Sequence, residues 1–266
     1  MLLKSKLDFI YTLQQGGGQP HVYPKDLSKI EIPIPPIDIQ MQIVSELDGY
    51  RKIIAGAEEI IGNYKITLPY ISDATTVEIG GICTKVQYGI SDKLNTENKG
   101  FKVFRMNELV GGFAIDRGNM KYVDIGVKEF HKYKLEEGDV LFNRTNSYEH
   151  VGRTGIYKLN GDYCFASYLI RLSVNKSKVL PDFLNLYMNT KEFQSGIKQK
   201  ATRAVGQANI NAQSLKQAVV ALPSLESQKQ IIELAKKERE HIVSAKKLAE
   251  LFEEKIKLRI NEVWGE

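Results

Sequence analysis

A passage that occurs twice constrains the fold of this 266-residue chain more than any other feature of its sequence. The first copy, GQPHVYPKDLSKIEIPIPPIDIQMQIV, begins at Gly18, and the second, GQANINAQSLKQAVVALPSLESQKQII, begins at Gly206. An offset of 188 aligns them without a gap, with identical residues at seven of the 26 positions from Gly18 to Ile43. Each copy predicts the same order of elements: a Gly-Gln turn, an amphipathic stretch, a strand that ends in proline, and a helix. We interpret the two passages as products of an internal duplication.

Both copies lead into a long helix whose apolar residues recur at alternating steps of four and three, which is the heptad pattern of a coiled-coil seam. In the first helix, predicted from about Ile39 to Ile66, the seam comprises Ile43, Leu47, Tyr50, Ile54, Ala57, Ile61 and Tyr64. In the second, predicted from about Glu226 to Val263, it comprises Ile231, Ala235, Glu238, Ile242, Ala245, Ala249 and Phe252, with Ile256 beyond. Because the two seams share a register, we predict that the helices pack antiparallel within one chain. The alternative is that each helix covers the core of a globular domain.

The sequence between the two helices has a different character, with short β-rich runs separated by glycine and polar turns. Strands are predicted at 101–106, 139–145 and 163–174, and a helix begins at Pro181, where proline and an acidic residue give a start signal. The predicted fold class is therefore α+β, with one mixed α/β domain and two long helices that form an antiparallel coiled coil. We expect the chain to divide into the tail of another such domain (1–34), the first helix (35–71), the mixed domain (72–222) and the second helix (223–266).

Motifs for catalysis, cofactor binding and metal binding are absent from the sequence. There is no GxxxxGK[ST] phosphate loop, and the one Pro-Pro pair, at Pro35, is followed by Ile37 rather than by the aromatic residue of a nucleic-acid methyltransferase motif. Cys83 and Cys164 have no ligand spacing and are predicted to be ordinary buried thiols. We therefore predict a non-catalytic protein with no cofactor and no metal. No apolar run approaches the roughly 20 residues that a membrane span requires, so we expect a cytoplasmic protein without membrane association.

Side chains suited to DNA binding are concentrated in predicted loops. The formal net charge of +5 weakly favours an anionic partner such as nucleic acid, and arginine and asparagine read guanine and adenine edges through paired hydrogen bonds. The DNA-binding candidates are Arg144, Asn146, Ser147, Tyr148, Arg153, Arg203, Gln207, Gln87, Tyr88, Lys93 and Arg105. The competing interpretation is that the asparagine, glycine and serine only form turns and that the arginines are solvated. For Gln207, the duplicated Gln19 also favours a role in the fold.

The segments IEIPIPPIDIQMQIV and VVALPSLESQKQII, each leading into a heptad helix, together with GDVLFNRTNSYEHVGRTGIY, resemble the specificity subunits of type I restriction-modification systems. The resemblance covers nearly the whole chain. It implies target-recognition domains that alternate with two helices, which pack as an antiparallel coiled coil and space the domains along double-stranded DNA. It also implies a non-catalytic subunit that directs partner methyltransferase (M) and restriction (R) subunits to a target site. A non-catalytic coiled-coil adaptor for protein interactions is the alternative.

The chain departs from this family pattern at residues 1–34, which correspond to only the last part of a first recognition domain. The resemblance therefore implies a truncated or half-length subunit with one complete recognition domain. A two-part target needs two readers, and an isolated domain tail exposes surfaces that a domain body would cover. We accordingly expect a homodimer, or pairing with another specificity fragment.

Overall fold

The computed structural model describes residues 7–15, 20–28, 30, 34–69, 72–204 and 207–264, which fall into two compact units. The helical unit comprises Met1–Tyr64 and Glu238–Glu266, and the mixed unit comprises Lys65–Lys237. The domain boundaries expected from the sequence remain predictions. The α+β fold class is confirmed, since one unit is built from helices and the other from strands and helices together.

The described residues of the helical unit form two short helices and two long ones: α2 (Leu7–Thr12), α3 (Pro24–Leu27), α4 (Ile37–Asn63) and the part of α10 (Leu225–Trp264) that follows Lys237. The Pro35-Pro36 pair directly precedes α4. The fixed backbone angle of proline favours the start of a helix at this point. The helix ends three residues earlier than the sequence predicted, at Asn63, since Tyr64 is extended with ψ 125°.

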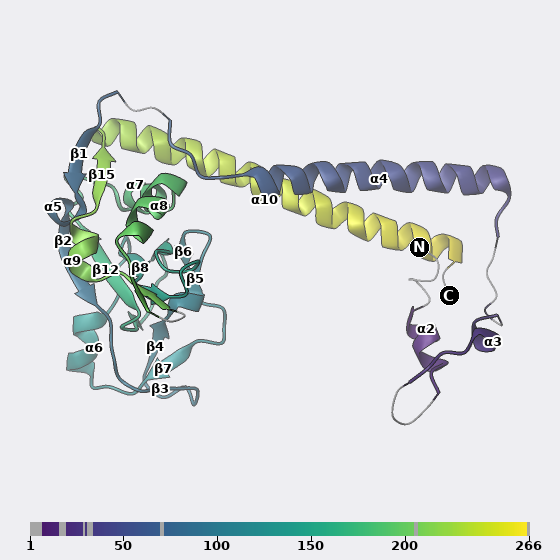
Figure 1. Cartoon of the computed structure of the whole chain (residues 1–266), viewed down its shortest axis with the longest axis horizontal. Coiled ribbons are helices and arrows are strands. Elements are labelled where there is room, and N and C mark those ends of the chain that lie inside the picture. Colours follow the sequence, from purple (N-terminus) through teal and green to yellow (C-terminus); the bar gives the residue numbers. More distant parts are fainter. Residues whose placement is uncertain are drawn as a thin grey trace. The chain divides into compact units, whose positions relative to one another are not determined.

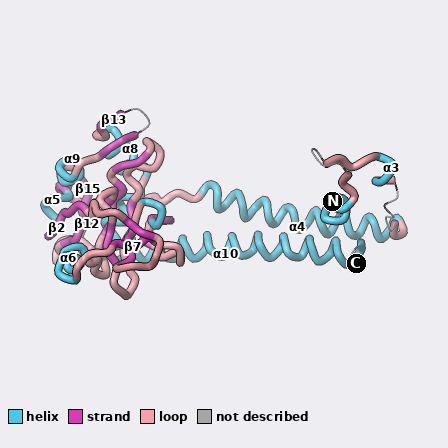
Figure 2. Tube along the Cα trace, turned by 90° about the horizontal axis from the view of Figure 1, so that it is seen from below, coloured by secondary structure: helices cyan, strands magenta, loops and turns pink. Residues whose placement is uncertain are grey.

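The two long helices of this unit are antiparallel. The Tyr50 ring centroid lies 5.2 Å from that of Phe252, and the Tyr64 hydroxyl lies 3.5 Å from the Glu238 carboxylate. Tyr50 in α4 therefore meets a later residue of α10 than Tyr64 does, although Tyr64 follows α4 in the chain, and Figure 2 shows the helices side by side. This confirms the antiparallel helix pair of the predicted fold class.

The heptad pattern describes which face of α4 is buried. Ile43, Leu47 and Ala57 are at most 4% exposed, and the other seam positions of α4 are half-buried. Outside the seam, the residues of α4 from position 41 onwards are exposed except Glu46, which is half-buried and accepts a hydrogen bond of 3.0 Å from Nε of Arg259. On α10, the seam positions 242, 252 and 256 are half-buried.

Ile231 differs from its predicted place. The heptad pattern assigned it to the helix pair, but the structure places it in the hydrophobic core of the mixed unit, together with Ala235. The first turns of α10 cover that core, so the same periodic stripe serves two different purposes along one helix. Periodicity alone cannot distinguish a partner helix from a domain core, because both bury one face.

The internal duplication is visible in the contacts that each copy makes. The amide of Gln40 donates to the carbonyl of Pro35 at 2.7 Å, and the amide of Gln228 donates to the carbonyl of Pro223 at 2.9 Å. Each bond joins the first turn of a long helix to the proline that ends the preceding strand or extended segment. The proposed repeat therefore has the same local structure at both ends of the offset.

The helix pair follows the same offset. Tyr50 and Glu238 are equivalent under the shift of 188, and so are Tyr64 and Phe252. The contact between Tyr50 and Phe252 is therefore the counterpart of the contact between Tyr64 and Glu238. Ala57 lies midway between Tyr50 and Tyr64, and its equivalent Ala245 lies midway between Glu238 and Phe252, so the two contacts are related by a local twofold.

The mixed unit contains strands of four sheets among its described residues (Figure 1). The six-stranded sheet has the order β2 (Cys83–Tyr88), β12 (Leu169–Val174), β8 (Val140–Asn143), β10 (Thr154–Ile156), β6 (Phe113–Ala114) and β5 (Leu109–Val110). The four-stranded sheet has the order β11 (Tyr163–Phe165), β4 (Phe101–Phe104), β7 (Lys121–Val123) and β3 (Leu94–Asn95). The smaller sheets are β13 (Thr202–Ala204), β14 (Gln207–Asn209) and β9 (Thr145–Asn146), and the antiparallel pair β1 (Thr75–Glu78) and β15 (Val219–Leu222).

The helices of the mixed unit are α5 (Ile79–Ile82), the 3-10 helix η1 (Met106–Glu108), α6 (Val127–Tyr133), α7 (Pro181–Met188), α8 (Lys191–Gln199) and α9 (Ala212–Lys216). Helix α7 begins at the predicted proline. The hydroxyl of Thr190 accepts from the backbone N–H of Phe193 and starts α8 as a separate helix. The strand predicted at 163–174 is also two strands, in two different sheets, with a turn at 166–168.

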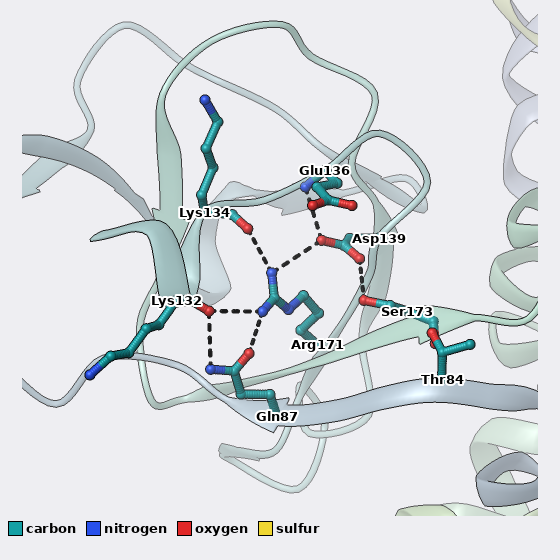
Figure 3. Close-up of polar contacts among 8 residues, drawn as sticks. All are labelled: Thr84, Gln87, Lys132, Lys134, Glu136, Asp139, Arg171 and Ser173. Atoms are coloured by element: carbon teal, nitrogen blue, oxygen red, sulfur yellow. Dashed lines mark hydrogen bonds and ion pairs between the residues drawn. The ribbon is translucent and has the colours of Figure 1, made fainter. Parts of the chain in front are cut away.

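A buried polar network lies inside the mixed unit (Figure 3). Arg171 on β12 is 3% exposed, and its guanidinium donates to the carbonyls of Lys134 at 2.6 Å and Lys132 at 3.1 Å, to the side-chain oxygen of Gln87, and to Asp139 at 3.5 Å. Lys132 lies near the end of α6 and Lys134 is its C-cap. The network therefore joins four segments of the chain: the end of α6, the turn before β8, strand β2 and strand β12.

Candidate nucleic-acid interface

The basic excess of the chain is confined to the mixed unit. Counted over the sequence, this unit has 25 Lys and Arg against 17 Asp and Glu, whereas the helical unit has 12 against 15. An anionic partner is therefore favoured by the mixed unit alone.

Two of the candidate loops meet in the structure. Strand β9 pairs antiparallel with β14, so that Asn146 is opposite Ala208 and Thr145 is opposite Asn209. The Thr145 hydroxyl donates to the Asn209 side-chain oxygen at 3.1 Å. The segment that carries Arg144 and Asn146 thus lies beside the segment around Gln207, although about 60 residues separate them in the sequence.

Arg144 is held from two sides. Its guanidinium carbon lies 4.8 Å above the centre of the Tyr88 ring, and its Nη1 donates to the carbonyl of Ser167 at 3.4 Å. The Tyr88 hydroxyl accepts from the backbone N–H of Ala212 at 2.7 Å, which fixes the ring. A guanidinium stacked on a fixed ring keeps its N–H groups in a defined plane, as bidentate recognition of guanine requires.

Asn146 is half-buried and uses its amide locally. Its nitrogen donates to the sulfur of Met106 at 3.0 Å, and its oxygen accepts from the backbone N–H of Ser147 at 2.8 Å. Thioether sulfur is a weak acceptor, so the first of these bonds is easily exchanged for a stronger one. The amide is therefore suited to binding an acceptor on a base edge.

Lys93 and Arg105 line one recess of about 470 Å³. Met106 and Ser167, which hold Asn146 and Arg144, are also in its wall, so the recess adjoins both loop candidates. Arg105 forms an ion pair of 2.6 Å with Glu108, which is 1% exposed, and its charge is thereby offset. Lys93 is exposed and is the better candidate for a phosphate contact.

The remaining candidates differ in how the structure places them. Tyr148 is 42% exposed, with the ammonium of Lys198 at 5.9 Å from its ring centre, and Arg153 is exposed. The carbonyl of Ser147 accepts from the N–H groups of His150 and Val151 and turns the loop. The side chains of Arg203 and Gln207 lie outside the described set, although their backbones belong to β13 and β14.

Gln87 is not brought together with the loop candidates. Its amide donates to the carbonyl of Lys132 at 3.3 Å and its oxygen accepts from Arg171, so both ends of the side chain are used inside the polar network. Its neighbour Tyr88 is the exposed member of the pair, because successive residues of a strand point to opposite faces.

Sequence reasoning missed the turn at 166–168. Tyr168 is 50% exposed and lines the recess beside Ser167. The turn was hidden within a run that reads as one strand, and the only local signal was the small polar break Ala-Ser at 166–167.

Neither a cluster of metal ligands nor a reactive thiol appears in the part of the chain that the structure describes. No three His, Cys, Asp or Glu side chains of this part gather closely enough to hold a metal. Cys164 is buried and Cys83 half-buried, both as free thiols. Burial raises the pKa of each thiol to about 12, so they stay protonated and unreactive near neutral pH. Within the same described ranges, no helix is both long enough and apolar enough to cross a membrane.

Comparison with known families decides what kind of chain this is. The family of the type I restriction modification DNA specificity domain matches residues 1–68 and 71–251. The chain belongs to this family. The match covers both copies of the duplicated passage and the whole mixed unit except residues 69 and 70.

Two curated members of the specificity family illustrate the relation. The putative type I restriction enzyme MjaX specificity subunit of Methanocaldococcus jannaschii is 33% identical over 159 residues, which are 59% of this chain and 37% of that protein. The type I restriction enzyme EcoKI specificity subunit of Escherichia coli is 24% identical over 250 residues, which are 84% of this chain and 53% of that protein. The chain thus spans about half the length, or less, of these relatives.

Solved structures share the fold of this specificity-family chain. A chain from a study of complex assembly and conformational transition in a type I R-M system has a TM-score of 0.66 at 16% identity, covering 98% of this chain and 67% of that chain. The type I restriction-modification S subunit from M. genitalium has a TM-score of 0.54 at 14% identity, covering 100% of this chain and 71% of that chain.

Proposed function

We propose that this chain is the DNA-recognition subunit of a type I restriction-modification complex and has no catalytic activity of its own. The observation that carries the proposal is that Arg144, stacked on Tyr88, and Asn146 both contact residues that line one recess of a basic unit, in a chain of the specificity family. These are side chains with which proteins stack on nucleic acid and read base edges. Arg144 reads a base, and Asn146 exchanges its bond to Met106 for a base-edge contact.

The other candidates have roles that do not depend on the base sequence. Lys93 and Arg153 are exposed cations and contact phosphates, which position the duplex without reading it. Tyr148, Ser147 and Arg105 border the reading site, and Arg203 and Gln207 join it through strands β13 and β14. Gln87 has a structural role, since its hydrogen bonds to Lys132 and Arg171 join β2 to the buried polar network.

The proposed partners are double-stranded DNA and the methyltransferase and restriction subunits of the same system. The relatives are named as specificity subunits of type I restriction enzymes, so their chains act within larger assemblies. The helical unit carries no basic excess and suits protein contacts better than DNA. We place the complex in the cytoplasm, with its DNA substrate.

Comparison of the duplicated helix starts supports pairing with a second specificity chain. In the second copy, Gln228 is fully buried, and besides its bond to Pro223 it accepts from the N–H of Leu180 and donates to the carbonyl of Lys178. In the first copy, Gln40 makes the proline bond and is only half-buried.

Apolar side chains around the first copy are also more exposed than their equivalents. Ile34, Ile37 and Val44 are 78%, 71% and 57% exposed, whereas the equivalent Leu222, Leu225 and Ile232 are half-buried, Leu222 and Ile232 against the core of the mixed unit. Ile37 and Val44 are seven residues apart and so share one face of α4, and Ile34 lies just before the helix. We call these three residues the apolar patch, and exposed apolar side chains gathered in this way are typical of an interaction site. The chain therefore forms a homodimer or pairs with another specificity fragment, which covers this patch.

The test of DNA recognition begins with selection of preferred duplexes from a random pool by the full chain, alone and with its methyltransferase subunit. Replacing Arg144 by alanine should cost about 1–3 kcal/mol of affinity for the selected duplex and relax the preference at one base pair. Lys176→Ala is the matched control, because Lys176 is an exposed cation just beyond the far end of β12. Absence of any DNA binding in both settings would favour the coiled-coil adaptor.

The test of pairing is light scattering over a concentration series. Ile37→Ser with Val44→Ser should shift the mass from dimer toward monomer, because both exposed side chains belong to the patch. Val243→Ser, an exposed valine on α10, is the control. A monomeric mass for the wild type at high micromolar concentration, with and without DNA, contradicts the pairing.

A further inference from the structure

The loop between β8 and β10, residues 144–152, carries Arg144 and Asn146, and the structure closes it at its base. The backbone N–H of Asn143 donates to the carbonyl of Arg153 at 2.8 Å, and the N–H of Gly152 donates to the carbonyl of Asn143 at 2.8 Å. The Asn143 side chain is fully buried and donates to the carbonyl of His150 at 3.0 Å. The two ends of the loop are therefore fixed to each other.

Helix α8 supports the second half of this loop through Gln194. The Gln194 amide donates to the carbonyl of Gly152 at 2.7 Å and to the carbonyl of Met188 at 2.6 Å. One side chain thus bridges the end of the loop and the end of α7. Gly152 has a φ of +90°, and a Cβ at this position would lie 2.8 Å from the Gln194 side-chain oxygen. The positive φ favours glycine here, and a Cβ at this position would displace the end of the Gln194 side chain.

Lys198 extends the same support by one helical turn. Residues four apart lie on the same face of a helix, and the Lys198 ammonium donates to the carbonyl of Glu149 at 2.9 Å. The first half of the loop is paired with β14, as described for Asn146. The reading loop is therefore held on one side by a strand and on the other by α8.

We propose that Gln194 is a positioning residue for DNA readout: it holds the loop of residues 144–152 in the conformation in which Arg144 and Asn146 meet the bases, without touching DNA itself. This inference rests on the proposed DNA-recognition function. A pre-formed loop binds its target without losing conformational freedom at that moment, so its fixation contributes to affinity. Gln194 is uncharged, and it therefore has no part in the electrostatic attraction that governs binding to random DNA.

The distinguishing variant is Gln194→Met, which keeps the length of the side chain and removes both donated hydrogen bonds without adding charge. We expect its dissociation constant for the selected duplex to rise about tenfold, which corresponds to the loss of one to two hydrogen bonds, while its dissociation constant for random duplex stays within about twofold. Gln199→Met is the matched control, since Gln199 is an exposed glutamine on the same helix. Gly152→Ala should reproduce the loss of affinity for the selected duplex.

A second measurement does not depend on DNA. Amide hydrogen exchange at His150, Val151 and Gly152 should be faster in Gln194→Met than in the wild type or in Gln199→Met, with the melting temperature well above the assay temperature in all three. Equal changes in affinity for both duplexes, or unchanged exchange in the loop, overturn the positioning role. If the wild type prefers no duplex over another while the exchange result holds, the proposed function fails and Gln194 remains only a loop support.

Discussion

Replacing Arg171 by leucine tests how much of the stability of the mixed unit depends on one buried cation. Arg171 donates to four different groups in three segments, and its side chain is 4% exposed. Leucine fills part of the space but donates to none of them. In this variant the carbonyl of Lys132 still accepts a hydrogen bond from the Gln87 amide. The carbonyl of Lys134 loses its hydrogen bond of 2.6 Å from Arg171.

The loss of stability in Arg171→Leu depends mainly on the buried carboxylate of Asp139, which the substitution leaves without a cation. The Asp139 side chain is 5% exposed and in the variant still accepts hydrogen bonds from the Ser173 hydroxyl at 2.6 Å and from the N–H of Glu136 at 3.0 Å. It no longer has an ion-pair partner. An unpaired buried charge costs about 3–5 kcal/mol, and an unsatisfied buried carbonyl adds about 1–3 kcal/mol. The distance of 3.5 Å between Arg171 and Asp139 is long for an ion pair, which favours the lower end. We expect Arg171→Leu to lower the free energy of unfolding by about 4 kcal/mol, a large part of the about 5–15 kcal/mol that a domain has.

The assay is urea unfolding of the full chain, followed by near-ultraviolet circular dichroism of the tyrosines. Asp139→Asn keeps an acceptor for Glu136 and removes the charge, so the double variant Arg171→Leu/Asp139→Asn should be more stable than the sum of the two single changes by at least about 1 kcal/mol. Lys128→Leu, at an exposed position on α6, is the control. A loss below about 1 kcal/mol for Arg171→Leu, or strict additivity in the double variant, would refute the reasoning.

Three further outcomes follow from the contacts of the two units. Ile54→Asp should melt the helix pair and lower helicity at 222 nm, at a cost of about 3 kcal/mol for a charge in a half-buried seam, whereas Ile53→Asp, next to it on the exposed side, should change the melting temperature little. Tyr88→Phe should keep most DNA affinity because the ring still supports the arginine above it, and Tyr88→Leu should weaken binding about fivefold; equal losses in titrations of the two variants would exclude a stacking role. The hydrogen bond from Tyr50 lowers the pKa of Glu46 below its ordinary value of 4.5, so this stabilisation is present above pH 4.5 and is lost as the pH falls through the folded-state pKa. Thermal melts between pH 7 and 3 should therefore show less acid sensitivity in Glu46→Gln than in the wild type, and identical pH profiles would exclude this contribution.

Features of the fold with a period in the sequence could be predicted, because periodicity is a local property. The heptad steps place Ile43, Leu47 and Ala57 on one face of α4 whatever lies opposite, and the structure buries that face. Which element packs against that face depends on the tertiary structure and cannot be read from the period. The same steps continue through Ile231, where the neighbour is the core of the mixed unit instead of a second helix.

Breaks in secondary structure that depend on distant residues could not be predicted. The turn at 166–168 forms because the N–H of Ala166 donates to the carbonyl of Phe104 and the N–H of Ser167 donates to the carbonyl of Ile90, both far away in the sequence. For the same reason, composition placed Gln87 among the DNA contacts, although its amide meets Arg171 inside the unit. The loop candidates Arg144 and Asn146 could be singled out from residue type, but their relation to Tyr88 and β14 needed the fold.

The local twofold relation of the helix pair has a consequence for how copies of the chain find each other. Under the offset of 188, Tyr50 is equivalent to Glu238, and Tyr64, which directly follows α4, is equivalent to Phe252. The seam of α4 can therefore pack against α10 of its own chain or against α10 of another copy with the same contacts. Exchange of helices between two copies preserves the seam contacts, as in domain swapping. Which arrangement forms is then decided by effective concentration, because the covalent tether favours closure within one chain until the protein concentration exceeds the effective concentration that the tether sets. A sample refolded at high concentration would retain helix-exchanged dimers after dilution until the helix pairs dissociate. Its oligomeric state would therefore depend on the concentration at which it was refolded.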